Sequence, residues 1–164
     1  MIDVRPLQAS DVQYVRSLLA NEEINAALHA GDQSRWGSDP DPDERNFILC
    51  CDDAPVGWLK LNGLLGDKAW ISMLVIEPRF QWQGIGTFAV RWGEEFVYSL
   101  GLKKIAVRTT ADNLPARACY EKLGYVLVKK GKYTTGDCVR RKGWTFEKEL
   151  NSILYPTANN IRRL

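Results

Sequence analysis

A strand, a glycine turn and a helix follow one another between Trp70 and Leu100, and this unit constrains the fold more than any other stretch. The run from Trp70 to Ile76 is almost entirely apolar, partly β-branched and soon followed by a proline, which is typical of a central strand buried on both faces. Apolar residues then recur at helical spacing from Ile85 onwards. The turn between strand and helix therefore presents backbone N–H groups at the positive end of a helix dipole, an arrangement that binds phosphate.

The glycines of this turn, Gly84 and Gly86, admit more than one interpretation. They can serve a tight turn without any ligand, since G-x-G alone is a weak signal. With Ala89 they also fit the dinucleotide fingerprint G-x-G-x-x-A, and Asp112 lies about 20 residues further on, where that motif places its ribose-binding acid. The order of elements argues against a dinucleotide, because hairpin-like segments precede the unit and too little chain follows to complete a doubly wound sheet.

A third interpretation uses two blocks of sequence. Gln81-x-x-Gly84-x-Gly86 resembles the Q/R-x-x-G-x-G/A signature of the GNAT superfamily of N-acetyltransferases. Residues 113–125, N-L-P-A-R-A-C-Y-E-K-L-G-Y, resemble the second block of that family, N-x-x-A-x-x-x-Y-E-x-x-G-F/Y. Two blocks in this order and at this separation are far more specific than either block alone.

Composition and charge narrow the range of partners. The 164 residues include 22 basic and 20 acidic side chains, and this balance predicts neither a nucleic-acid nor a membrane partner. No apolar run reaches bilayer-spanning length and the N-terminus has no signal-peptide pattern, so we expect a cytoplasmic protein. The four cysteines lack metal-ligand spacing, so we expect reduced thiols and no metal.

The rest of the chain predicts short strands and helices around the central unit. Alternating or apolar runs predict strands over Ile2–Arg5, Asn46–Cys51, Val56–Leu61, Trp70–Ile76 and Ile105–Thr109, and a final hairpin with arms Val126–Lys130 and Trp144–Phe146. Besides the helix that follows the glycine turn, capping residues and helical spacing predict helices from Ser10 or Asp11, over Glu22–His29, and from Asn113 or Leu114 to Gly124. The segment K-G-K-Y-T-T-G-D between the hairpin arms is typical of a turn.

The length predicts one domain over residues 1–150, with 151–164 as a C-terminal tail that lacks a clear pattern. The resemblance implies an α/β (α+β) fold with a mixed, mostly antiparallel central sheet of about six or seven strands, flanked by about four helices. It also implies that the two central parallel strands splay apart, which the family achieves with a β-bulge.

The resemblance implies acetyl-CoA as the co-substrate. Backbone N–H groups of the turn would cradle the pyrophosphate, and the glycines would let it approach closely. The edge of the central strand would pair with the pantetheine amides as if they formed an added strand, and Asn113 would lie against the pantetheine arm. The residues expected to bind acetyl-CoA are Leu74, Val75, Ile76, Gln81, Trp82, Gln83, Gly84, Ile85, Gly86, Thr87, Asn113, Ala116 and Tyr120.

Transfer to an amine requires proton movements. Deprotonating a lysine-like amine of reference pKa about 10.4 costs about 4.6 kcal/mol at pH 7. Glu77, which follows the central strand where the splay should open, is our candidate base, with a solvated strand-end carboxylate as the alternative. The resemblance implies that the N–H of Ile76 holds the developing oxyanion and that Tyr120 protonates the departing thiolate.

We therefore expect an acyl-CoA-dependent N-acetyltransferase that moves an acetyl group to a primary amine by direct attack in a ternary complex. A catalytically silent acyl-CoA-binding or sensing module is one alternative, and a dinucleotide-binding oxidoreductase domain is another. The acceptor can be a small-molecule amine or a protein amine, and one hypothesis is that the acidic loop with Asp39, Asp41, Asp43 and Glu44 attracts a cationic amine. Many members of the family pair as dimers, so a homodimer is one expectation.

Overall fold

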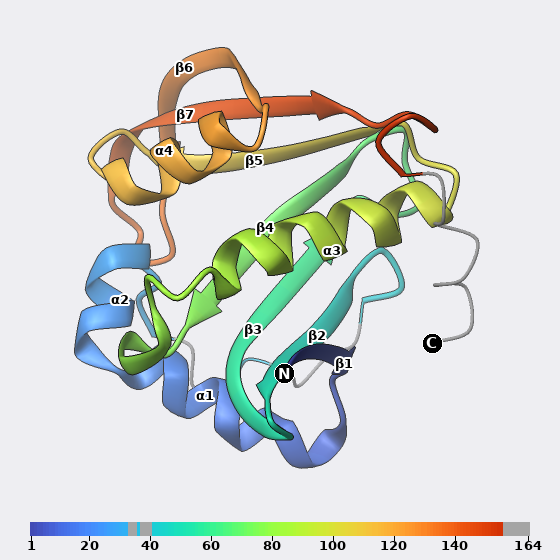
Figure 1. Cartoon of the computed structure of the whole chain (residues 1–164). Coiled ribbons are helices and arrows are strands. Elements are labelled where there is room, and N and C mark those ends of the chain that lie inside the picture. Colours follow the sequence, from blue (N-terminus) through green and yellow to red (C-terminus); the bar gives the residue numbers. More distant parts are fainter. Residues whose placement is uncertain (33–35, 37–40, 156–164) are drawn as a thin grey trace.

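A computed structural model describes residues 1–32, 36 and 41–155 of the chain. These residues form a seven-stranded sheet in the order β1-β2-β3-β4-β5-β7-β6 (Figure 1). The strands are β1 (Ile2–Pro6), β2 (Arg45–Cys51), β3 (Ala54–Asn62), β4 (Ala69–Ile76), β5 (Lys104–Thr110), β6 (Val126–Thr134) and β7 (Arg140–Glu149). The α-helices are α1 (Val12–Ala20), α2 (Glu22–Leu28), α3 (Ile85–Ser99) and α4 (Leu114–Lys122), with 3-10 turns at Ala9–Asp11 and Pro78–Phe80. The sheet is antiparallel except for the β4–β5 pair, which confirms the predicted fold class.

Helices cover both faces of the sheet, and this explains why its inner strands are mostly apolar. In β2, Phe47 and Leu49 pack in the core that includes α3, whereas Ile48 and Cys50 pack in a second core under α1 and α2. Successive side chains of a strand point to opposite faces, so each inner strand must supply apolar residues to both cores.

The two parallel strands at the centre of the sheet pair over only three residues. Ala69 to Ile71 of β4 lie opposite Ile105 to Val107 of β5, and beyond this point the strands separate. Figure 1 shows them diverging toward the end of the sheet where α2 and α4 lie. On its other side β4 stays paired with β3 as far as Ile76.

A β-bulge lies where the strands begin to separate. Lys60 and Leu61 of β3 are consecutive, but their partners in β4 are Met73 and Ile71, so Ser72 is an extra residue. A bulge bends its strand and increases the local twist, which here carries β4 away from β5. The predicted splay of the central strands is therefore present, and Ser72 produces it.

The last hairpin is longer than the sequence predicts. The expected arms, Val126–Lys130 and Trp144–Phe146, are parts of two long strands, and most of the expected turn belongs to β6. The reason is a cross-strand fit: Tyr133 lies over Gly143, where an added Cβ would come within 1.8 Å of the Tyr133 ring. The glycine thus makes room for the ring of an extended strand, and the turn begins only after Thr134.

The turn of this hairpin touches the end of α2. The N–H of Asp137 donates to the carbonyl of His29 at 3.0 Å, and an added Cβ at Gly136 would meet the carbonyl oxygen of Ala30 at 2.2 Å. This close backbone contact joins the first and last thirds of the chain on the face of the sheet that α2 covers.

The start of the predicted tail packs on the domain. Tyr155 is buried, and its hydroxyl donates to Glu94 of α3. Residues 156–164 lie outside the described residues. Within the described part of the chain, no helix has the length and apolar character needed to cross a membrane.

Candidate functional site

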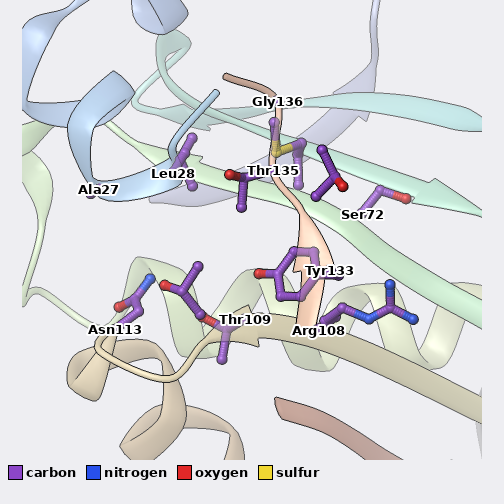
Figure 2. Close-up of a pocket in the computed structure, with 12 residues that line it drawn as sticks. Ala27, Leu28, Ser72, Arg108, Thr109, Asn113, Tyr133, Thr135 and Gly136 are labelled. Atoms are coloured by element: carbon purple, nitrogen blue, oxygen red, sulfur yellow. The ribbon is translucent and has the colours of Figure 1, made fainter. Parts of the chain in front are cut away.

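The separation of β4 and β5 opens a cleft in the sheet. Its narrow part, about 80 Å³, lies between Leu74 on one side and Asn113, Ala116 and Tyr120 on the other. A cavity of about 200 Å³ continues from it toward α2 and the hairpin turn, and Figure 2 shows its lining residues converging on one space. The lining residues of this cavity are Ala27, Leu28, Ser72, Met73, Arg108, Thr109, Thr110, Asn113, Tyr133, Thr134, Thr135 and Gly136.

The backbone of β4 has free polar groups along the cleft. The N–H of Glu77 donates to Val56 of the β3 segment at 2.9 Å, and in an antiparallel ladder alternate residues point to the partner strand. The backbone N–H and C=O groups of Val75 therefore point to β3, whereas those of Leu74 and Ile76 point to the open side of the strand. The side chain of Gln81 donates to the Ile76 carbonyl at 3.0 Å, which agrees with this direction.

The glycine turn leaves the first turn of α3 without a capping side chain. Gly84 is the N-cap with φ of 84°, and no side chain accepts from the N–H groups that follow it. An added Cβ at Gly84 or Gly86 would meet no protein atom within 4 Å, so the space over both glycines is open. Trp82 is 85% exposed and Gln83 donates to the Arg79 carbonyl at 3.0 Å. The turn thus offers N–H groups and room for an anion at a long helix.

The second block forms the opposite wall of the cleft. Asn113 caps α4, since its side-chain oxygen accepts from the N–H of Ala116 at 3.2 Å. Tyr120 is 6% exposed, and burial raises the pKa of its hydroxyl above the ordinary value, with Cys119 adding to the effect. Its ring packs edge-on against Tyr125 at 5.4 Å between centroids. A phenol held in this way stays protonated at neutral pH and is able to donate a proton.

Glu77 does not line the cleft. One of its carboxylate oxygens accepts from the Tyr14 hydroxyl at 2.9 Å and the other from Arg79 Nε at 2.8 Å. Burial, followed by the bond to Glu77, raises the pKa of Tyr14. The carboxylate therefore ties α1 to the segment that follows β4.

The described carboxylates of the acidic loop form hydrogen bonds and an ion pair with protein groups outside the cleft. Asp43 accepts from the N–H groups of Gly63 and Leu65 at 3.0 and 2.8 Å, and Glu44 pairs with Lys60 at 2.6 Å. Asp41 accepts from the N–H of Asp43 at 2.9 Å. These three carboxylates do not line the cleft, and Asp39 lies outside the described residues.

Two residues that line the cavity, Arg108 and Tyr133, are not among the site residues predicted from the sequence. Arg108 carries a visible signal, because it is the single charged residue in the otherwise apolar stretch I-A-V-R of a strand expected to be buried. Tyr133 carries none, because it falls in a segment whose composition is typical of a turn. Figure 2 shows both side chains at the same end of the cavity.

The fold and the cleft define an α/β domain that can add an extended ligand to an open sheet edge, with an anion at the start of the neighbouring helix. The family model for the acetyltransferase (GNAT) family matches residues 12–125, so the chain belongs to this family and the resemblance is confirmed. A curated relative, N-alpha-acetyltransferase 30 of Dictyostelium discoideum, is 27% identical over 100 residues, or 57% of this chain. The match spans about half of that relative, 54% of its length.

Solved structures share the fold. The ribosomal-protein-S18-alanine N-acetyltransferase of Escherichia coli aligns with a TM-score of 0.74 and 19% identity, covering 92% of this chain and 95% of its own. The spermidine N-acetyltransferase of Vibrio cholerae, in complex with CoA and spermine, aligns with a TM-score of 0.73 and 16% identity, covering 90% of this chain and 95% of its own. At these identities the likeness concerns the fold.

Proposed function

We propose that this chain is an acyl-CoA-dependent N-acetyltransferase that moves an acetyl group from acetyl-CoA to a primary amine by direct attack in a ternary complex. The proposal rests on one arrangement: the open edge of β4 and the hydroxyl of Tyr120 share one cleft, and the uncapped start of α3 follows β4 directly along the chain after the glycine turn. Family membership and the CoA complex of the Vibrio cholerae relative support it.

The residues present suit the parts of acetyl-CoA. N–H groups from Trp82 to Thr87 would bind the diphosphate in the open space over the two glycines. The carbonyl of Leu74 and the N–H of Ile76 would pair with the pantetheine amides, while Gln81 donates to the Ile76 carbonyl and fixes that end of the strand. The amide nitrogen of Asn113, whose oxygen is used by the cap of α4, would donate to the pantetheine arm.

The chemistry needs a donor to the thioester oxygen and an acid for the leaving thiolate. Leu74 lines the narrow part of the cleft together with Tyr120, whereas Ile76 does not. We therefore assign the N–H of Leu74, rather than that of Ile76, as the group that stabilises the oxyanion when the amine attacks. Tyr120 then gives its proton to the sulfur as the carbon–sulfur bond breaks, and the proton that the attacking nitrogen loses on forming the amide restores the phenol through water.

The contacts of Glu77 favour a positioning role over that of the base. Both of its oxygens are engaged, and no carboxylate lines the cavity among the described residues. We propose that the amine loses its proton to water and attacks as the neutral base.

A thiol-release assay tests the proposal. The purified chain is mixed with acetyl-CoA and a panel of primary amines, and release of free thiol is compared with a reaction that lacks the amine. Acetylation of at least one amine is the expected result. Binding of acetyl-CoA without any amine-dependent release would instead support the silent binding module. Calorimetric binding of NAD in place of CoA would support the dinucleotide alternative. Either of these two results would overturn the proposal.

A further inference from the structure

An arginine that lines the cavity lies close to two aromatic rings. Arg108, on β5, lines the narrow cleft and the cavity beyond it. Its guanidinium lies 5.4 Å from the centroid of the Trp70 ring and 5.3 Å from that of Tyr133. Figure 2 shows Arg108 beside Tyr133 at the end of the cavity away from Asn113. Aromatic contacts of this kind hold the guanidinium plane while its N–H edge stays available.

Most N–H donors of the Arg108 guanidinium have no hydrogen-bond acceptor among the described residues. Within the described part of the chain, the Arg108 side chain makes one hydrogen bond, a long contact of 3.4 Å from Nε to the Thr145 hydroxyl. Arg5 pairs with Asp11 and Arg141 with Asp137, whereas Arg108 forms no ion pair with any described residue. A guanidinium has five N–H donors in a planar fork that matches carboxylate and phosphate oxygens, so the terminal donors of Arg108 suit an anion from outside.

No carboxylate of the described residues lines either cavity to oppose such an anion. A cavity of about 360 Å³ at this end is lined by Asn62, Trp70, Ile71, Ser72, Arg108 and Tyr133, and Arg108 is its one charged residue. The charge of Asp112 is felt by the Tyr133 hydroxyl, but Asp112 lines neither cavity. The lining also holds a buried acceptor, the side-chain oxygen of Asn62, which has no partner among the described residues.

We propose that the acceptor is an amine that also carries an oxyanion, a carboxylate or a phosphate, and that Arg108 binds this group. The inference rests on the proposed function, and it names the acceptor class of the same site. Polycationic acceptors, including spermidine, the substrate named for the Vibrio cholerae relative, are disfavoured by the guanidinium.

Matched acceptor pairs test the assignment. Each pair is an amino acid and its decarboxylated amine, such as ornithine with putrescine, histidine with histamine and tyrosine with tyramine. Phosphoethanolamine with ethanolamine forms a phosphate arm that separates the two anion types. Both kcat/KM for acetyl transfer and binding to the CoA complex are measured for each member. The acid member is expected to be preferred, by about ten- to a hundredfold for one charge-assisted contact.

Substitution of the arginine identifies the cause. Arg108→Gln removes the charge from an exposed side chain, so the variant should fold, and it should abolish the preference mainly through KM. Arg91→Gln on α3, an equal charge change at an exposed position outside the cavity, should keep the preference. Equal or better use of the decarboxylated amines, an unchanged preference in Arg108→Gln, or a panel in which nothing binds would overturn the assignment. If no amine reacts but the acids bind in an Arg108-dependent way, the proposed function fails and the anion site stands.

Discussion

Replacing Tyr120 with phenylalanine tests the proposed mechanism most directly. The substitution removes one buried hydroxyl and keeps the ring, which packs against Tyr125. Because the hydroxyl is assigned to the leaving sulfur alone, the affinity for acetyl-CoA should change little, while kcat should fall. A merely structural tyrosine would show the reverse pattern, with altered stability or binding and an unchanged kcat.

The size of the effect follows from the leaving group. Proton transfer from a positioned acid to a leaving group contributes about 10²- to 10⁴-fold to the rate, and phenylalanine has no proton to give. A loss at the lower end of this range, about a hundredfold in kcat, corresponds to about 2.7 kcal/mol of transition-state stabilisation. Burial raises the pKa of Tyr120 above the ordinary phenol value, so the acid form is fully present at lower pH and is lost only as pH rises through that raised pKa. The ratio of wild-type to variant kcat should therefore stay constant between about pH 6 and pH 9.

Single-turnover acetylation with saturating acceptor is the appropriate assay, because it observes the chemical step rather than product release. Calorimetry with CoA on both proteins controls for cofactor binding, and urea unfolding controls for stability. Equal rates for the two proteins would remove Tyr120 from the mechanism. A ratio that collapses within the range from about pH 7 to pH 9 would show that the acid is a different group with a lower pKa.

Four further changes separate the roles assigned to the site and the fold. Deleting Ser72 should restore a regular β4 ladder and abolish CoA binding in calorimetry, whereas Ser72→Ala keeps the extra residue and should bind normally. Gly86→Val should weaken CoA binding at least about tenfold with little loss of thermal stability, since a side chain there enters open space rather than protein. Glu94→Ala should lower the free energy of unfolding by about 3 kcal/mol in urea, because Lys148 at 2.9 Å loses its buried partner. Glu77→Gln should reduce kcat by less than about fivefold, whereas loss of a true general base would reduce it a hundredfold or more.

The sequence was sufficient for features that depend on local pattern. The strand Trp70–Ile76, the glycine turn and the helix after it all lie within one or two residues of their predicted positions. A strand buried on both faces and a helix with one apolar face have patterns that little else produces. Family motifs then supplied the order of the remaining elements and the placement of Asn113 and Tyr120 at one cleft.

Features that depend on distant pairing were beyond the sequence. The surroundings of Glu77 depend on Tyr14, which is 63 residues away and reaches it only because α1 packs on this end of the sheet. Tyr133 enters the cavity because Gly143 of the opposite strand accommodates its ring, and composition alone favours a turn there. Such contacts are set by register, and local propensity carries no information about register between strands.

The bulge at Ser72 links the fold to the proposed chemistry because it changes the alternation of side-chain and backbone directions along β4. In a regular strand, residues 71, 73 and 75 would face the same side, but Ile71 packs in the core that includes α3, whereas Met73 and Val75 pack under α1 and α2. One extra residue therefore reverses the direction in which each later side chain and backbone group of β4 points. The inversion turns the N–H groups of residues 73 and 75 to β3 and leaves those of Leu74 and Ile76 on the open side. Without the extra residue, the N–H of Leu74 would donate to β3. The splayed strand would then present the backbone groups of residues 73 and 75 to the cleft. The same residue thus separates the strands and exposes the donor assigned to the oxyanion.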